Sequence, residues 1–479
     1  MTPDPQTSHA DAGVRRSVFL ASTLSSFLTP FMGSSVNVAL PAISRDLGLD
    51  AVLMSWIATA YLLAAAIGLV PAGRIADLRG RKKVFLAGMS VYTAGSLLCA
   101  IAATSAQLIV FRIVQGFGGA MMFGTSMAIV TSVFPREERG KILGYTVSAV
   151  YLGLSLGPFV GGLLTDQLGW RSVFLINVPL GIAVIAYSLV AMKGEWLGKE
   201  GGGFDLAGSL LYGLSLLGVM YGFSHITDAY GGTFVAGGIV LLAIFIWWEY
   251  RSASPILNLQ LVVKNKVFGL SNLAAFINYA ATAGVTFLMS LYLQYMKGFD
   301  AKTAGVILVA QPAIMALLSP FAGRLSDRVE PRIVASAGMA LTTIGLVLLA
   351  FLTETTQTEI VVVSLVVLGA GFGLFSSPNT NAVMSSVTPA QYGTASAFSG
   401  TMRLVGQVFS MGIVTLLLAA QTGAGAVGPA ETGSLMRVHR TAFSLFALMA
   451  LAGIFASLVR GNVRKQRSVD DSHKGTSHG

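Results

Sequence analysis

The chain has 479 residues, of which 54% are hydrophobic and only 11% are charged, and its mean hydropathy is +0.72. A soluble domain is about 25% charged because its surface faces water, so this composition excludes an ordinary soluble protein. The formal net charge of +10 is compatible with a nucleic-acid partner. The bases, however, flank apolar segments on one side of a membrane, which argues against that class. The single cysteine, Cys99, forms no internal disulfide.

The chain opens with a polar segment, residues 1–16, that lacks a cleavable apolar core, and we predict a cytoplasmic tail rather than a signal peptide. Apolar runs of about 20 residues follow, the length that crosses a bilayer core. Because lipid tolerates no unpaired backbone groups and the runs are too long for barrel strands, we predict an all-α polytopic membrane protein. Fourteen such runs lie at 17–41, 54–73, 84–104, 107–129, 142–164, 173–192, 206–224, 232–248, 268–294, 304–322, 333–352, 360–381, 394–419 and 441–459.

The runs are arranged as six, two and six. We expect an N-terminal six-helix bundle at 17–192, a linker with two extra transmembrane helices at 193–250, a C-terminal six-helix bundle at 251–459 and a disordered cytoplasmic tail at 460–479. A Gly-x-x-x-Asp turn follows the second run of each bundle, at 73–77 and at 323–327. This recurrence indicates two related halves, and such repeats place a substrate path at their interface near mid-membrane.

Charge sets the orientation. With the N-terminus inside, 23 of the 31 Lys and Arg residues fall in cytoplasmic segments, six fall in external segments and two, Arg112 and Arg403, fall inside runs. This positive-inside bias predicts an integral plasma (inner) membrane protein with both termini in the cytoplasm. The lipid bilayer is its surroundings, and we expect no nucleic-acid partner.

The turn after the second run contains Gly73, Asp77, Gly80 and Arg81, and it resembles the signature loop of the major facilitator superfamily, with Leu78 as a departure. The resemblance implies a gate: Asp77 accepts hydrogen bonds from the N-terminus of the run at 394–419 and holds the cytoplasmic side shut. The alternative interpretation is a tight turn with topogenic charge.

Run four carries Arg112, Gln115 and Gly116 in a pattern that resembles the superfamily's R-x-x-Q-G-x-G motif. A guanidinium stays charged and is costly to bury in a membrane, so Arg112 must face a wet cavity or a partner. The resemblance makes it the central polar group. Arg403, nine residues into its run, is open to a structural role across the two halves or to substrate contact.

Run five carries a glycine-rich pattern that resembles the antiporter motif of drug exporters. Glycines every four residues give a smooth helix face for close packing, and a proline favours a bend. The alternative is packing without an export role. The residues of this pattern are Gly153, Gly157, Pro158, Gly161 and Gly162.

The segments Trp170–Gly181, Phe204–Asp205 and Pro255–Leu259 resemble the fourteen-span drug/proton antiporter (multidrug efflux) family, and the span count agrees. That family's first span reads L-D-x-T-I-V-N-V-A-L-P, but here Met32 occupies the place of the aspartate. We find no carboxylate within any run. Proton coupling is therefore unusual, uses His225 or His439, or is absent.

The resemblance implies a major facilitator fold and a secondary transporter, not an enzyme, that exports drug-like or amphiphilic molecules, with ion-gradient (proton) coupling. Two alternatives stay open: a transporter of an anionic metabolite or lipid with unusual or no proton coupling, and a non-transporting receptor or scaffold. We expect no cofactor, no metal and, by default, a monomer. Further candidates to line the substrate path are Asn37, Tyr61, Asn278, Tyr279, Gln311, Asn379 and Gln407.

Overall fold

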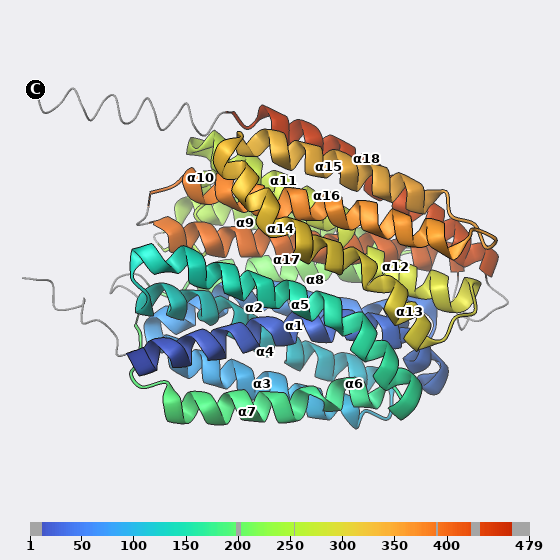
Figure 1. Ribbon diagram of the computed structural model, residues 1–479, viewed down its shortest axis with the longest axis horizontal. Helices are drawn as coiled ribbons and strands as arrows, with labels where there is room; N and C mark the ends of the chain where they lie inside the picture. Colours follow the sequence, from blue (N-terminus) through green and yellow to red (C-terminus); the bar gives the residue numbers. More distant parts are fainter. Residues whose placement is uncertain (1–11, 198–202, 253, 389–390, 423–431, 462–479) are drawn as a thin grey trace, which may run out of the picture.

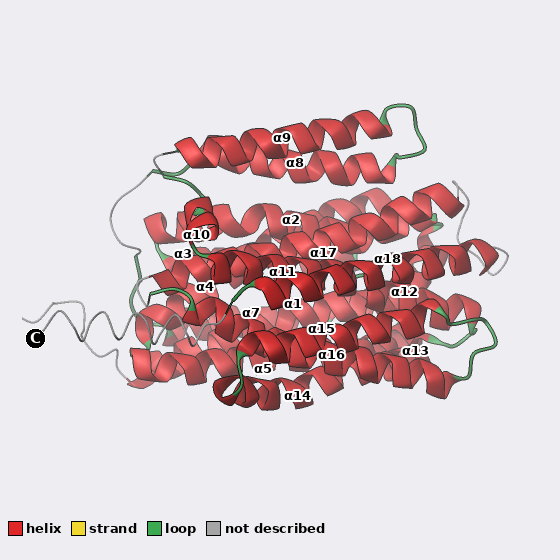
Figure 2. Ribbon diagram, turned by 90° about the horizontal axis from the view of Figure 1, so that it is seen from above, coloured by secondary structure: helices red, strands yellow, loops and turns green. Residues whose placement is uncertain are grey.

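The computed structural model describes residues 12–197, 203–252, 254–388, 391–422 and 432–461, and every regular element within these ranges is a helix (Figures 1 and 2). The helices run roughly along one direction. The first and last described residues lie at the same end of the bundle, which we call the terminal end (Figure 1). We call the opposite end, which holds the loops at 48–50 and 297–300, the distal end.

The first seven helices pack against one another, with α1 against α5 and α4, α2 against α4, and α3 against α4 and α7. We call them the N-terminal group. Their bounds are α1 Ala12–Leu47, α2 Ala51–Arg79, α3 Arg81–Ala100, α4 Ser105–Val133, α5 Arg136–Leu168, α6 Arg171–Leu175 and α7 Asn177–Ala191.

The last helices form a second set, the C-terminal group, in which α16 packs on α14 and α15, and α18 packs on α15 and α11. A short π-helix, η1, continues α12. The bounds are α11 Lys266–Thr282, α12 Val285–Leu291, η1 Tyr292–Met296, α13 Ala301–Leu308, α14 Ala310–Arg328, α15 Pro331–Ala350, α16 Thr358–Ser385, α17 Tyr392–Thr422 and α18 Thr432–Val459.

Between the two groups in sequence come α8 (Leu206–Ser224), α9 (Gly231–Arg251) and the short α10 (Leu259–Lys264). The α8–α9 pair lies along one edge of the bundle (Figure 2). Helix α8 contacts both α2 and α17, which belong to different groups. The hydroxyl of Tyr212 donates to the carbonyl of Ala66 (3.2 Å), and the indole of Trp56 donates to Ser224 (2.8 Å). The inserted pair therefore covers the seam between the groups.

Thirteen helical segments of the described chain are long and apolar enough to cross a membrane, and α1 is the fourteenth long helix. Helix α1 is less apolar because its serines face protein rather than lipid: Ser25 hydrogen-bonds Ser126 (2.9 Å) and Ser35 donates to the carbonyl of Gly157 (2.8 Å). This arrangement is the all-α, fourteen-helix fold that the sequence predicts.

Two sequence-based expectations need correction. Glu249, which we placed outside the apolar run 232–248, lies within α9 and is only 4% exposed, so a carboxylate does occur inside a candidate span. Arg460, which we assigned to the disordered tail, is fully buried at the end of α18. Its Nη1 donates to Asn379 (2.7 Å) and contacts Ser271 (3.3 Å). The rest of the tail, residues 462–479, lies outside the described residues. Both corrections have one cause: burial by distant helices is invisible in local hydropathy.

Candidate functional site

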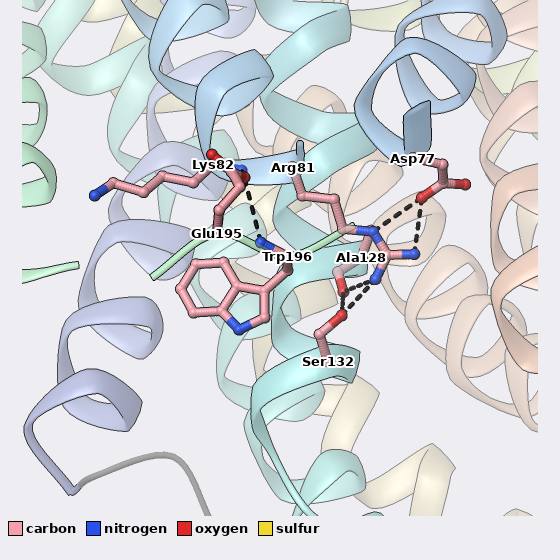
Figure 3. Close-up of polar contacts among 7 residues, drawn as sticks. All are labelled: Asp77, Arg81, Lys82, Ala128, Ser132, Glu195 and Trp196. Atoms are coloured by element: carbon pink, nitrogen blue, oxygen red, sulfur yellow. Dashed lines mark hydrogen bonds and ion pairs between the residues drawn. The ribbon is translucent and has the colours of Figure 1, made fainter. Parts of the chain in front are cut away.

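The turn between α2 and α3 is held by an ion pair. Asp77 Oδ1, near the end of α2, lies 2.8 Å from the guanidinium of Arg81, the first residue of α3 (Figure 3). Arg81 also donates to the carbonyl of Ala128 (3.0 Å) and to the hydroxyl of Ser132, both on α4. The predicted gate residues Asp77 and Arg81 thus tie the terminal ends of α2, α3 and α4 together.

Glu195, which no sequence pattern indicated, also contributes to this turn. The carboxylate of Glu195 accepts a hydrogen bond from the backbone N–H of Lys82 (2.7 Å), and the carbonyl of Trp196 accepts from the N–H of Arg81 (2.9 Å; Figure 3). Glu195 therefore caps α3, whose own N-cap residue, Gly80, has no side chain to do so. A negative charge at a helix N-terminus is also stabilised by the helix dipole.

Glycine at position 80 suits the backbone of this turn and leaves room for the side chain of Glu195. Its φ of +112° lies in a region that residues with a side chain rarely adopt. A Cβ at this position would also lie 2.6 Å from the carboxyl carbon of Glu195. The other glycine of the motif, Gly73, has open space beside its Cα.

Among the residues that the structure describes, Asp77 forms no hydrogen bond or ion pair with the C-terminal group in this arrangement. Among the described residues, the Asp77 carboxylate pairs with Arg81 and not with the N-terminus of α17. Pro389 and Ala390, just before that helix, lie outside the described residues. The N- and C-terminal groups instead meet in the middle and at the distal end.

The glycine pattern of α5 presents two faces. Gly153, Gly157 and Gly161 face α1 of the same group, where a Cβ on Gly153 would lie 2.5 Å from the carbonyl oxygen of Phe27 and one on Gly161 would lie 2.6 Å from Cα of Ser35. These contacts are backbone to backbone, which only a residue without a side chain permits.

The second face of α5 joins the two groups. A Cβ on Gly162 would collide with the carbonyl oxygen of Ala301, and a Cβ on Gly305 of α13 would collide with the carbonyl oxygen of Pro158. Nearby, Gln294 of η1 donates to the carbonyl of Val38 in α1 (2.9 Å). These contacts close the molecule at its distal end.

Arg112 lies inside the N-terminal group and is 1% exposed. Its Nε donates to the carbonyl of Ile57 (3.0 Å) and its Nη1 donates to Gln115 (2.5 Å), whose amide donates in turn to Ser96 (2.7 Å). The ring of Tyr61 lies 4.4 Å from the guanidinium carbon, a cation–π contact. Arg112 therefore has a set of partners within its own group.

Arg403 differs from Arg112. It is partly exposed, and its guanidinium lies over the ring of Phe123, 4.4 Å from the ring centre. Phe123 belongs to α4 and Arg403 to α17, so the contact crosses between the groups. Gln407, one helical turn beyond Arg403, is partly exposed as well.

The other predicted path residues occupy different environments. Met32 is fully buried, and its sulfur lies 3.9 Å from the amide nitrogen of Asn177 on α7. The amide of Asn379 is occupied at both ends, by Arg460 and by the carbonyl of Ser271. Asn278 is fully buried, and both its amide nitrogen and its oxygen lack a hydrogen-bond partner.

Three further candidates for the substrate path lie on different helices. Gln311 of α14 is 8% exposed, Asn37 of α1 is half-buried, and Tyr279 of α11 packs edge-on against Phe372. His439, one of the two histidines considered for proton coupling, is 1% exposed, and its Nε2 lies 3.0 Å from the carbonyl oxygen of Leu349.

Asp205 and Glu249 are the two buried carboxylates among the described residues, and both lie at the terminal end of the α8–α9 pair. Asp205 accepts from the indole of Trp248 (3.0 Å), and Glu249 accepts from the backbone N–H of Leu257 (2.8 Å). Asp205, which also caps α8 through the N–H of Gly208, thus ties α8 to α9, and Glu249 fastens α9 to the segment that leads into the C-terminal group.

Known proteins resemble this chain along most of its length. The chain is 30% identical to the riboflavin transporter RibZ of Clostridioides difficile (strain 630), covering 79% of this chain and 82% of that protein. It is 31% identical to the multidrug resistance protein Stp of Mycobacterium tuberculosis (80% and 72% covered). It is 33% identical to the cephamycin export protein CmcT of Amycolatopsis lactamdurans (85% of each covered).

Solved structures share the fold. A bacterial homolog of the human lysosomal transporter Spinster, in an inward-facing and occupied conformation, superposes with a TM-score of 0.67 at 16% identity, covering 94% of this chain and 97% of that one. A peptide transporter in complex with alafosfalin gives a TM-score of 0.69 at 14% identity, covering 93% and 94%. The sequence profile described as Major Facilitator Superfamily matches residues 22–247 and 271–477. The chain is an integral membrane transporter that belongs to the Major Facilitator Superfamily.

Proposed function

We propose that this protein exports drug-like or other amphiphilic small molecules across the plasma membrane by alternating access, with its terminal end in the cytoplasm. The observation that carries the proposal is the distal closure, in which Gly162 and Gly305 let α5 and α13 touch backbone to backbone. Such a contact joins the two groups without side-chain interlocking, so rigid-body rocking can break it and remake it. The export names of the relatives Stp and CmcT support the direction.

In this proposal the two six-helix bundles rock around a central site, and the α8–α9 pair stays packed over the interface between them. Asp77, Arg81 and Glu195 hold the ends of α2, α3 and α4 as one rigid unit at the cytoplasmic side. In the outward-open state that unit would approach the N-terminus of α17. An imposed proton gradient is the proposed energy source.

A second candidate is transport of a neutral or anionic metabolite. It is favoured by Arg403, which brings a positive charge to the middle of the interface, and by the location of the buried carboxylates Asp205 and Glu249 away from it. The relative named a riboflavin transporter supports this candidate as well.

The test is reconstitution into liposomes with an imposed pH gradient, screening matched cationic, neutral and anionic substrates in the wild type and in Met32→Asp. Flux of an amphiphile that depends on the pH gradient confirms export. Flux that is the same with and without the pH gradient would refute proton coupling. Arg112→Ala distinguishes a transporter from a receptor, because a receptor has no flux to lose. Binding without flux under every gradient would refute the proposal.

A further inference from the structure

Arg112, Arg403 and Arg460 lie within or at the end of membrane-spanning helices, and they differ in what their N–H groups do. Arg112 donates to Ile57 and Gln115, and Arg460 donates to Asn379. Arg403, by contrast, has no hydrogen-bond acceptor and no ion pair among the described residues; its contact is the face of Phe123. Arg460 also has unused N–H groups, at Nε and Nη2, but it is fully buried. Because Arg403 is partly exposed, its guanidinium N–H groups are the ones that a bound molecule can reach.

Arg403 lies about 16 Å from the terminal end of α17, eleven residues into a helix that rises about 1.5 Å per residue. A charge at this depth of a membrane is costly unless it serves a partner or a wet path. On the same face of α17, a Cβ on Gly400 would lie 3.6 Å from Cε1 of Phe123, and Gln407 is partly exposed. The face formed by Gly400, Arg403 and Gln407 therefore combines a cation, an amide and a nearby ring.

Aromatic side chains from both groups lie at the contacts between neighbouring helices. The hydroxyl of Tyr151 on α5 donates to Ser376 of α16 (3.1 Å), and Tyr279 of α11 lies against α17, where a Cβ on Gly406 would lie 3.0 Å from the Cβ of Tyr279. Tyr151 packs in one apolar cluster with Phe372, and Tyr279 meets Phe372 edge-on at 5.3 Å between ring centres. Aromatic rings bind other flat rings by stacking and edge contacts.

Together, these groups provide one cation and several aromatic rings, and they include no carboxylate. The buried carboxylates of the described chain, Asp205 and Glu249, are bonded to groups of α8, α9 and the segment after α9 instead. A cationic ligand would therefore meet Arg403 unopposed, whereas an oxygen acceptor would receive its hydrogen bonds.

We propose that Arg403, Phe123, Tyr151, Tyr279 and Gln407 form a binding site for planar aromatic molecules that carry oxygen acceptors and are neutral or anionic. This inference rests on the proposed transport function and narrows its substrate class. Arg403 donates to the acceptor oxygens, and the rings bind the flat face of the ligand.

The experiment measures binding of three fluorescent planar probes to the purified full chain in detergent: riboflavin (neutral), flavin mononucleotide (anionic) and ethidium (cationic). We expect both flavins to bind more tightly than ethidium. Arg403→Gln should weaken flavin mononucleotide at least about 10-fold, the size of one lost charge-assisted hydrogen bond, and Arg403→Lys should restore part of it. Arg437→Gln, at an exposed arginine of α18, is the matched control and should change nothing.

Thermal melting of each variant separates loss of binding from loss of fold. Tighter binding of ethidium than of the flavins, no binding of either flavin, or an unchanged affinity in a folded Arg403→Gln variant would each overturn the inference. Since binding needs no gradient, its outcome is independent of export. If the probes bind in an Arg403-dependent way but no flux occurs in liposomes, the proposed function is refuted and this site is not. If flux is unchanged in Arg403→Gln, this site is refuted and the proposed function is not.

Discussion

The contact between Gly162 and Ala301 offers a direct test of the distal closure. In Gly162→Ala the new Cβ would collide with the carbonyl oxygen of Ala301 and lie 3.2 Å from Cα of Lys302. These are backbone atoms on the other group, so no side chain can turn away. Overpacking of this kind costs about 1–3 kcal/mol. Because the clash exists only while the groups touch, it should shift the balance toward the distally open state about 5- to 150-fold.

The assay is the rate at which a thiol at the distal seam reacts with a maleimide in detergent. Ser55 is fully buried between the groups, where its hydroxyl hydrogen-bonds Thr415 (2.9 Å), so the thiol of Ser55→Cys reacts only when the seam opens. The natural Cys99 is buried and is replaced by alanine to remove its signal. We expect Gly162→Ala to raise the labelling rate of the introduced thiol by at least about 5-fold.

The matched control is Gly161→Ala, whose Cβ would lie 2.6 Å from Cα of Ser35 on α1. This clash is as severe, but it lies within the N-terminal group and persists in both states. It should lower the melting temperature without raising the labelling rate. Equal labelling rates in the two alanine variants, or no rise with Gly162→Ala, would show that the α5–α13 contact does not govern the closure.

Glu195→Ala removes the cap of α3 and should lower the free energy of unfolding by about 0.5–2 kcal/mol, the value of a helix N-cap; an unchanged melting temperature in detergent would contradict this role. The hydrogen bonds from Arg171 and Trp170 lower the pKa of Asp46. Their contribution to stability is therefore present above about pH 4, the unfolded value, and is lost as the pH falls through the lowered pKa. Asp46→Asn should cost less than about 1 kcal/mol, as for other exposed pairs, and should abolish that pH dependence in melts between pH 2 and 6. For topology, an impermeant maleimide should label Glu354→Cys in intact cells but Glu138→Cys only after lysis, and the reverse pattern would invert the orientation.

Much of the architecture was predictable because its physical basis is local. Apolar runs long enough to span a bilayer predict helices wherever they occur, and the structure has them. The fourfold spacing of Gly153, Gly157 and Gly161 puts them on one helix face whatever that face meets. The spacing did not indicate that the adjacent Gly162 meets α13 rather than α1, because the partner of a helix face is chosen by packing.

The candidate site shows the same division. The sequence identified Arg112 and Arg403 as charges inside apolar runs, made Arg112 the central polar group by resemblance, and left Arg403 open to a structural role or to substrate contact. Packing separated them: Ile57 and Gln115 occupy the donors of Arg112, whereas Arg403 meets only an aromatic face. Met32, named for the path, contacts Asn177 inside its own group.

By itself, the sequence determined that this chain crosses a membrane many times, which stretches do so, and where glycine and charge interrupt them. Each of these depends on the composition of neighbouring residues. The tertiary structure alone decided that Glu195 caps a helix 113 residues earlier in the chain and that Glu249 is buried. It also decided that Arg403 is partly exposed while Arg112 and Arg460 are buried. These outcomes depend on how distant helices rotate and dock, and no local pattern encodes that rotation.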